Sequence, residues 1–191
     1  MTVERFVADD CGRPGGRERI AGDLRQPWLL VPALRRMGRT TLIREAFRTG
    51  TVGGLVMIPF ALLFRSLGLR VNEYERRTLE LVVGDVTPPL DSLLTLVQHL
   101  AISWVVAVPL LPLLGRFSRQ RDRLLIGLAY GAGFYVAVNS LALPLAFGDP
   151  TPWRLGFTVV YPSLVIHLVY GFTVALFARR VTLMGRSTAS K

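Results

Sequence analysis

The sequence predicts an all-α polytopic membrane protein: an antiparallel bundle of four transmembrane helices with a basic amphipathic segment beside the membrane. The chain has 191 residues, of which 51% are hydrophobic and 19% are charged, whereas about a quarter of the residues in a soluble domain are charged. The apolar residues gather in blocks with few or no charges. Blocks of about 20 residues match the ~30 Å hydrocarbon layer of a bilayer, so these blocks predict membrane spans.

The N-terminal part is expected to stay outside the bilayer. Residues 1–27 mix acidic and basic side chains around a glycine-rich break and lack an apolar periodicity, so they predict a disordered cytoplasmic tail. Residues 28–50 interleave arginines with apolar side chains and begin at Trp28, which predicts a basic amphipathic segment on the membrane surface. A solvated linker is the alternative for this segment.

Four apolar stretches predict the transmembrane domain 51–178, with spans at about 51–69, 93–114, 124–147 and 155–178. The first span contains Arg65 near its end, where a long side chain can reach the headgroups. The loop 70–91 is expected to hold a short surface helix that is capped by Asn72 and ends near Val83, before the pair Pro88-Pro89. A polar cytoplasmic tail follows at 179–191.

The distribution of basic residues predicts the orientation of the spans. If the N-terminus is cytoplasmic, the inner segments carry 18 Lys and Arg residues and the outer segments carry 4, so the positive-inside rule places both termini in the cytoplasm. The arginine bias fits a GC-rich genome, and we expect a bacterial inner membrane. The expected partners are anionic lipid headgroups at the arginine-rich face and either a second copy or another membrane protein. The hydrophobic composition argues against nucleic acid.

Small residues in the third span predict close helix packing. Gly127 and Gly131 form a GxxxG motif, and Ala129, Gly133 and Ala137 form a second row at four-residue spacing. Rows of this kind let helix backbones approach closely inside a bilayer.

Polar side chains inside the spans form a candidate seam, which consists of His99, Tyr135, Asn139, Ser163, His167 and Tyr170. The helical rise predicts two layers, His99 with Asn139 and Tyr135 with His167. The seam can be structural, with hydrogen bonds that fix helix register, or functional, binding a small ligand or moving protons. We expect His167 to be neutral and hydrogen-bonded, with Tyr135 as the best candidate partner.

Other kinds of site have less support in the sequence. The estimated depths of the two histidines differ by ~8 Å, so haem held by both is a distant third alternative. A zinc site would lack a third ligand, because no span contains a carboxylate or a cysteine. A glycine-rich phosphate loop and a nucleophile elbow are also missing from the sequence, so we predict no enzyme activity, no cofactor and no metal.

The second half of the chain resembles the closing half of YagU-like bacterial inner-membrane proteins, over roughly residues 100–180. The resemblance is carried by Pro144-Leu145, Thr151-Pro152-Trp153, His167-Leu168-Val169 and Arg179-Arg180, with Gln98-His99 near the place of a family histidine. It departs at Val138-Asn139, where the family tends to carry a histidine. The resemblance implies the fold and the inner-membrane location, and no catalytic residues.

Two functions follow as predictions. The first is a non-catalytic accessory or stress-related bundle that acts through partners or by oligomerising. The alternative is a membrane protein that handles a small ligand or protons with the polar seam around His99 and His167. A polar cavity that reaches the outer face would favour the alternative, and a dry, close-packed seam would favour the accessory bundle.

Overall fold

The computed structural model of the protein describes residues 38–71, 74–84 and 86–178. These residues form helices and turns in the order α3 (Arg39–Ser66), α4 (Tyr74–Val83), α5 (Pro88–Leu114), α6 (Gln120–Phe134), the π-helix η2 (Tyr135–Ala142), α7 (Leu143–Phe147), α8 (Pro152–Leu155) and α9 (Phe157–Phe177). The tails 1–27 and 179–191, residues 28–37 of the predicted surface segment, and the capping residue Asn72 lie outside the described residues.

Among the residues that the structure describes, four helices are long and apolar enough to cross a membrane: α3, α5, the continuous run Gln120–Phe147 and α9. This finding confirms the prediction of four membrane-length apolar helices, although their ends differ. Residues 39–50 belong to the same helix as the first span, because α3 runs without a break from Arg39 to Ser66. The pair Pro88-Pro89 begins α5, since proline is well tolerated in the first turn of a helix.

Glycines let α3 lie close to its neighbours. Gly50 and Gly54 face α5, where an added Cβ would lie 2.8 Å from the carbonyl oxygen of Ser103 and 2.7 Å from its Oγ, respectively. At Gly53 it would lie 3.0 Å from the ring of Tyr170 on α9. These glycines are therefore contact sites and not helix breaks.

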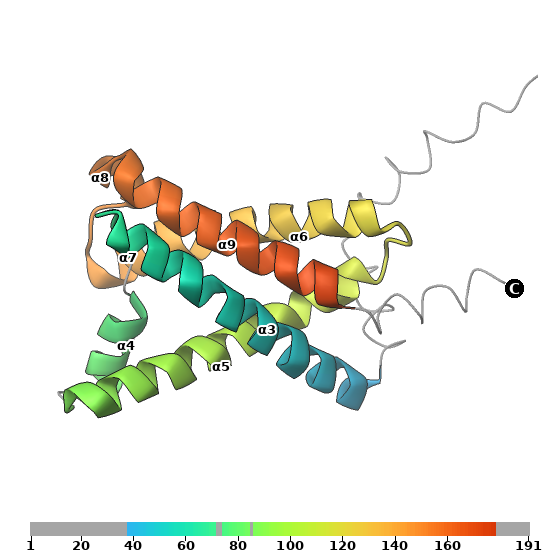
Figure 1. The fold of residues 1–191 in the computed structure, drawn as a ribbon, viewed down its shortest axis with the longest axis horizontal. Helices are drawn as coiled ribbons and strands as arrows, with labels where there is room; N and C mark the ends of the chain where they lie inside the picture. The colour runs from blue at the N-terminus through green and yellow to red at the C-terminus, as the bar shows by residue number, and fades with distance from the viewer. Residues whose placement is uncertain (1–37, 72–73, 85, 179–191) are drawn as a thin grey trace, which may run out of the picture.

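Helices α6 and α9 lie side by side in Figure 1, and the GxxxG motif lies at their contact. A Cβ on Gly127 would overlap the carbonyl oxygen of Gly171, and a Cβ on Gly131 would overlap that of His167. The second small-residue row does not contribute to packing within the chain, because Ala129, Gly133 and Ala137 are exposed. A shift of two residues turns a helix by about 200°, which places the second row on the opposite face from the first.

The core lies at the end of the molecule where α3 begins and α5 and α9 end. We call this the packed end; its buried cluster consists of Ala46, Ala107, Leu110, Leu111, Leu114, Tyr170, Val174, Ala175 and Ala178. Two arginines bind the C-terminal end of α9 beside this cluster. Arg48 Nη2 donates to the carbonyl oxygen of Phe177 at 2.7 Å, and Arg123 Nη2 donates to that of Ala178 at 2.6 Å. The last carbonyls of a helix lack partners within it and carry partial negative charge, so these arginines satisfy the end of α9.

The opposite end of the molecule is more open. In Figure 1, α5 crosses α3 and diverges from the α6–α9 pair, so that the start of α5 lies beside α4 and away from α7 and α8. We call this the cavity end, defined by α4, the start of α5, η2, α7, α8 and the start of α9. Ion pairs connect α4 to its surroundings: Arg76 lies 3.6 Å from Asp91 on α5, and Arg77 contacts Asp149 after α7.

Candidate functional site

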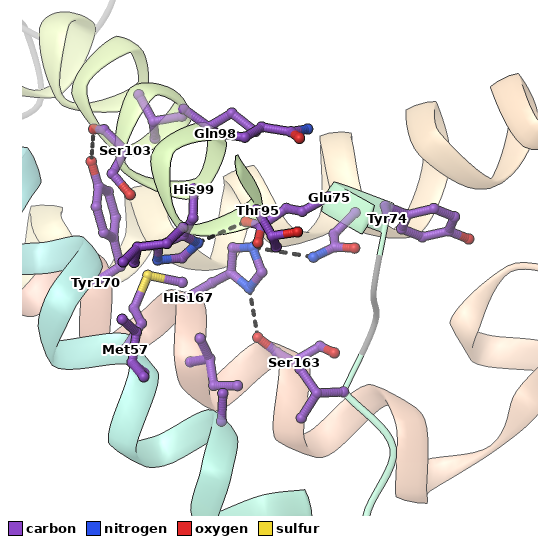
Figure 2. Close-up of a pocket in the computed structure, with 18 of the residues that line it drawn as sticks. Met57, Tyr74, Glu75, Thr95, Gln98, His99, Ser103, Ser163, His167 and Tyr170 are labelled. Atoms are coloured by element: carbon purple, nitrogen blue, oxygen red, sulfur yellow. Dashed lines mark hydrogen bonds and ion pairs between the residues drawn. The ribbon is translucent and has the colours of Figure 1, made fainter. Parts of the chain in front are cut away.

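A cavity of about 610 Å³ lies among α3, α4, α5, η2 and α9 at the cavity end. Its surface is mainly apolar, with polar side chains gathered on the walls formed by α4, α5, η2 and α9 (Figure 2). Five of the six seam residues line it: His99, Asn139, Ser163, His167 and Tyr170. The sixth, Tyr135, does not reach the cavity.

His167 makes two hydrogen bonds that define its protonation state. Its Nδ1 lies 2.6 Å from the carbonyl oxygen of Ser163, which can only accept, so Nδ1 carries a hydrogen. Its Nε2 lies 3.2 Å from Nδ2 of Asn139, whose amide group donates to it. A neutral imidazole satisfies both contacts. The expected state of His167 therefore agrees with the geometry, but its partner is Asn139 and not Tyr135.

The predicted layers differ from the structure. Asn139 bonds His167 on α9, and His99 bonds Glu75 on α4. The layers were predicted for a regular α-helix, whereas Asn139 lies in the π-helix η2, which has i→i+5 hydrogen bonds and more residues per turn. The Tyr135 ring still packs against the His167 ring, with 5.6 Å between their centroids, but its buried hydroxyl has no hydrogen-bond partner among the described residues.

His99 is bound by a residue that the sequence analysis did not select. Its Nδ1 lies 2.8 Å from Oε1 of Glu75 on α4, and its Nε2 lies 3.1 Å from the carbonyl oxygen of Gly54 on α3. The Gly54 carbonyl can only accept, so Nε2 carries a hydrogen. A second hydrogen lies between Nδ1 and Glu75, either on the imidazole as an ion pair or on the carboxyl as a neutral pair.

Sequence reasoning missed Glu75 because it searched for carboxylates only inside the spans. The signal that could have identified it is the spacing on α4, where Tyr74, Glu75 and Thr78 share one helix face. All three line the cavity. A short helix that follows a span directly can fold back and bring such a face to the bundle.

Further hydrogen bonds tie the cavity walls together. The hydroxyl of Tyr170 donates to the carbonyl oxygen of Ser103, and that of Tyr130 donates to the carbonyl oxygen of Val106 at 2.8 Å. Both bonds join the α6–α9 pair to α5. On the cavity wall, Oε1 of Gln98 is buried without a hydrogen-bond partner among the residues that the structure describes. This oxygen is an acceptor that a ligand could use.

The remaining polar chemistry is limited in the described part of the chain. It holds no group of three or more His, Cys, Asp or Glu side chains that could bind a metal ion. All four imidazole nitrogens of His99 and His167 already have protein partners. A haem iron bound by these histidines would have to displace Glu75 or Gly54 on one side and Asn139 or Ser163 on the other.

Comparisons of the chain with protein-family models, with curated proteins and with solved structures give no match. The resemblance to YagU-like proteins therefore stays a prediction.

Proposed function

We propose that this integral membrane protein binds a small, largely apolar molecule with hydrogen-bonding groups in the cavity between α3, α5, η2 and α9. The cavity itself carries the proposal. Its volume of about 610 Å³ lies within the range of ligand pockets, which is about 300–1,000 Å³. A bundle in which the polar residues only fixed helix register would fill this space with side chains, because protein interiors are close-packed.

The cavity walls offer a ligand two kinds of contact, apolar and polar. The apolar surface favours a hydrocarbon or ring system, since its burial removes apolar area from contact with water or lipid headgroups. The pairs Glu75–His99 and Asn139–His167 hold polar groups in fixed positions, and Gln98 offers an acceptor. Preorganised polar groups in a mainly apolar pocket are typical of ligand-binding sites.

A cavity-filling substitution tests this function. Val138 lines the cavity, whereas Val136, two residues earlier in η2, is 40% exposed and does not. We expect a small molecule to co-purify with the wild-type protein and with Val136→Phe, and to be lost from Val138→Phe, as measured by native mass spectrometry. Equal retention by all three proteins, or no retained molecule on the wild type, would overturn the proposal.

The proposal includes a location. The four helices form an antiparallel bundle in a bacterial inner membrane, with cytoplasmic termini and the cavity end toward the outer face. The excess of basic residues in the predicted inner segments supports this orientation. Reporter fusions test it: we expect an outside signal at Arg77 and an inside signal at Lys191, and the reverse at either position excludes the orientation.

A second candidate function is the accessory bundle that works by oligomerising. One observation favours it: Ala129, Gly133 and Ala137 form a small-residue row on an exposed face of α6 and η2, and such rows mediate helix association in membranes. Gly133→Leu should then shift the protein toward monomer in cross-linking experiments. An unchanged oligomeric state would exclude this use of the row.

A further inference from the structure

A second cavity, of about 630 Å³, adjoins the first at the cavity end. It is lined by the turn after α3, by α4, by the turn after α7, and by the residues Leu155 and Val159 of α8 and α9. Arg65, Val71 and Tyr74 line both cavities. The two spaces therefore meet at these three side chains, where the first span ends and α4 begins.

The chemistry of the second cavity differs from that of the first. Its described lining includes three arginines, Arg65, Arg70 and Arg77, against one carboxylate, Asp149. Arg77 forms an ion pair with Asp149 and lies 4.8 Å above the centre of the Phe147 ring, so its guanidinium is held in place. Arg70 is exposed and has no ion pair with another described residue.

Tyr74 lies at the junction of the cavities, beside Asp149. Its burial, and then the charge of Asp149 and the hydrogen bond to it, raises the pKa of Tyr74, so the phenol keeps its proton at neutral pH. Guanidinium groups bind phosphate and carboxylate through paired N–H donors. Arg70 and Arg77 present such guanidinium groups to one space, which is thus suited to an anion.

We propose that the two cavities hold one amphiphile, with its anionic head, a phosphate or a carboxylate, among Arg65, Arg70 and Arg77, and its apolar chain in the cavity of 610 Å³. This inference rests on the proposed function and adds the chemical class of the ligand. Arg65 and Arg70 lie where the first span ends, which is the depth of lipid headgroups in a bilayer. The head thus stays near water while the chain passes Tyr74 into the bundle.

Three probes separate the contributions of head and chain: dodecyl phosphate, dodecanol and inorganic phosphate. The full chain is purified in a neutral detergent, and the bound fraction of each probe is measured by native mass spectrometry. We expect dodecyl phosphate to bind about tenfold more tightly than dodecanol or inorganic phosphate, because only it uses both cavities. If inorganic phosphate binds as tightly as dodecyl phosphate, the site takes a free anion and the amphiphile is excluded.

Arginine variants test the head site. In Arg70→Gln/Arg77→Gln, the affinity for dodecyl phosphate should fall about tenfold, to that of dodecanol, while dodecanol binding stays unchanged. Arg154→Gln, at an exposed arginine that lines neither cavity, should bind as the wild type does. Arg70→Gln alone retains the Arg77–Asp149 ion pair and should lose part of the affinity for dodecyl phosphate. This single variant tests the head site even if the double variant folds poorly.

The outcomes distinguish this inference from the proposed function. If the arginine variants leave dodecyl phosphate binding unchanged while Val138→Phe abolishes it, the anionic head is wrong and the cavity function stands. If Val138→Phe changes the binding of neither dodecyl phosphate nor dodecanol, both the cavity function and the amphiphile are wrong.

Discussion

The packed end and the cavity end of this molecule are built from the same helices but hold them together differently. At the packed end, α6 and α9 touch through glycine backbones, leucines of α5 are fully buried, and Arg48 and Arg123 bind the last carbonyls of α9. At the cavity end, side chains bridge the helices across a space, through the pairs Glu75–His99 and Asn139–His167. The difference suggests that stability is concentrated at one end and ligand binding at the other.

The largest expected effect is a break in the glycine contact of the packed end. Gly127→Val would place its side chain against the carbonyl oxygen of Gly171 and the Cβ of Ala175. Overpacking of this kind costs about 1–3 kcal/mol, and more where backbone must move. We expect a large loss of stability in detergent-melting curves. Gly133→Val, measured like Gly127→Val on monomeric protein, is the matched control on the same helix, because nothing within the chain lies within 4 Å of its Cβ position. Equal melting of the two monomeric variants would contradict the close contact.

Removal of Arg123, the α6 residue that binds the end of α9, should have the next largest effect on stability. Arg123 is 2% exposed, and its side chain donates to the carbonyl oxygen of Ala178. Arg123→Ala leaves this carbonyl without a charged donor, at a cost of about 1.5–3 kcal/mol. Arg121→Ala, at an exposed position on α6, provides the comparison in the same melting assay. A wild-type melting temperature for Arg123→Ala would show that the packed end does not depend on this bond.

A smaller effect is expected for the bond between η2 and α9. His167→Leu removes the acceptor of the Asn139 amide and should cost on the order of 1–2 kcal/mol, whereas His167→Gln retains donor and acceptor groups and should be tolerated. A double-mutant cycle of His167→Leu with Asn139→Leu isolates the pair, with a coupling of ~0.6–2 kcal/mol. If His167→Leu melts at the same temperature as the wild type or higher, the prediction of a structural role for this histidine is wrong.

The smallest effect on stability should come from Glu75. Its side chain is 39% exposed, so the contact with His99 is partly screened by solvent and an amide can replace it; we expect Glu75→Gln to cost less than ~1 kcal/mol. Glu80→Gln is the control on the same helix, with a 49% exposed side chain. A loss as large as that of Arg123→Ala would show that the two ends do not differ in the way we describe.

The sequence was sufficient to predict the four apolar helices, because span length and hydropathy depend on composition alone. It also placed Gly127 and Gly131 at a helix contact. It could not predict which small-residue row faces inward: both rows have the same spacing, and the outward direction of Gly133 depends on where α9 lies.

The site was harder to predict, for two physical reasons. Asn139, the partner of His167, lies in a π-helix, whose side-chain directions a regular α-helix does not anticipate. The contact of Glu75 with His99 depends on how α4 folds back, which is a property of the tertiary structure. The cavity itself reflects the divergence of α5 from α9, and no residue pattern in the sequence specifies that angle.

The π-helix also makes the third span sensitive to chain length in a way that substitutions would not reveal. Residues 135–142 follow i→i+5 spacing, so the direction of every later side chain depends on how many residues the segment contains. A deletion of one residue there would barely change hydropathy, but it would rotate α7 relative to α6. Phe147 would then leave Tyr74 and Arg77, with which its ring now stacks. The number of residues in this segment, and not only their identity, determines how the bundle meets α4.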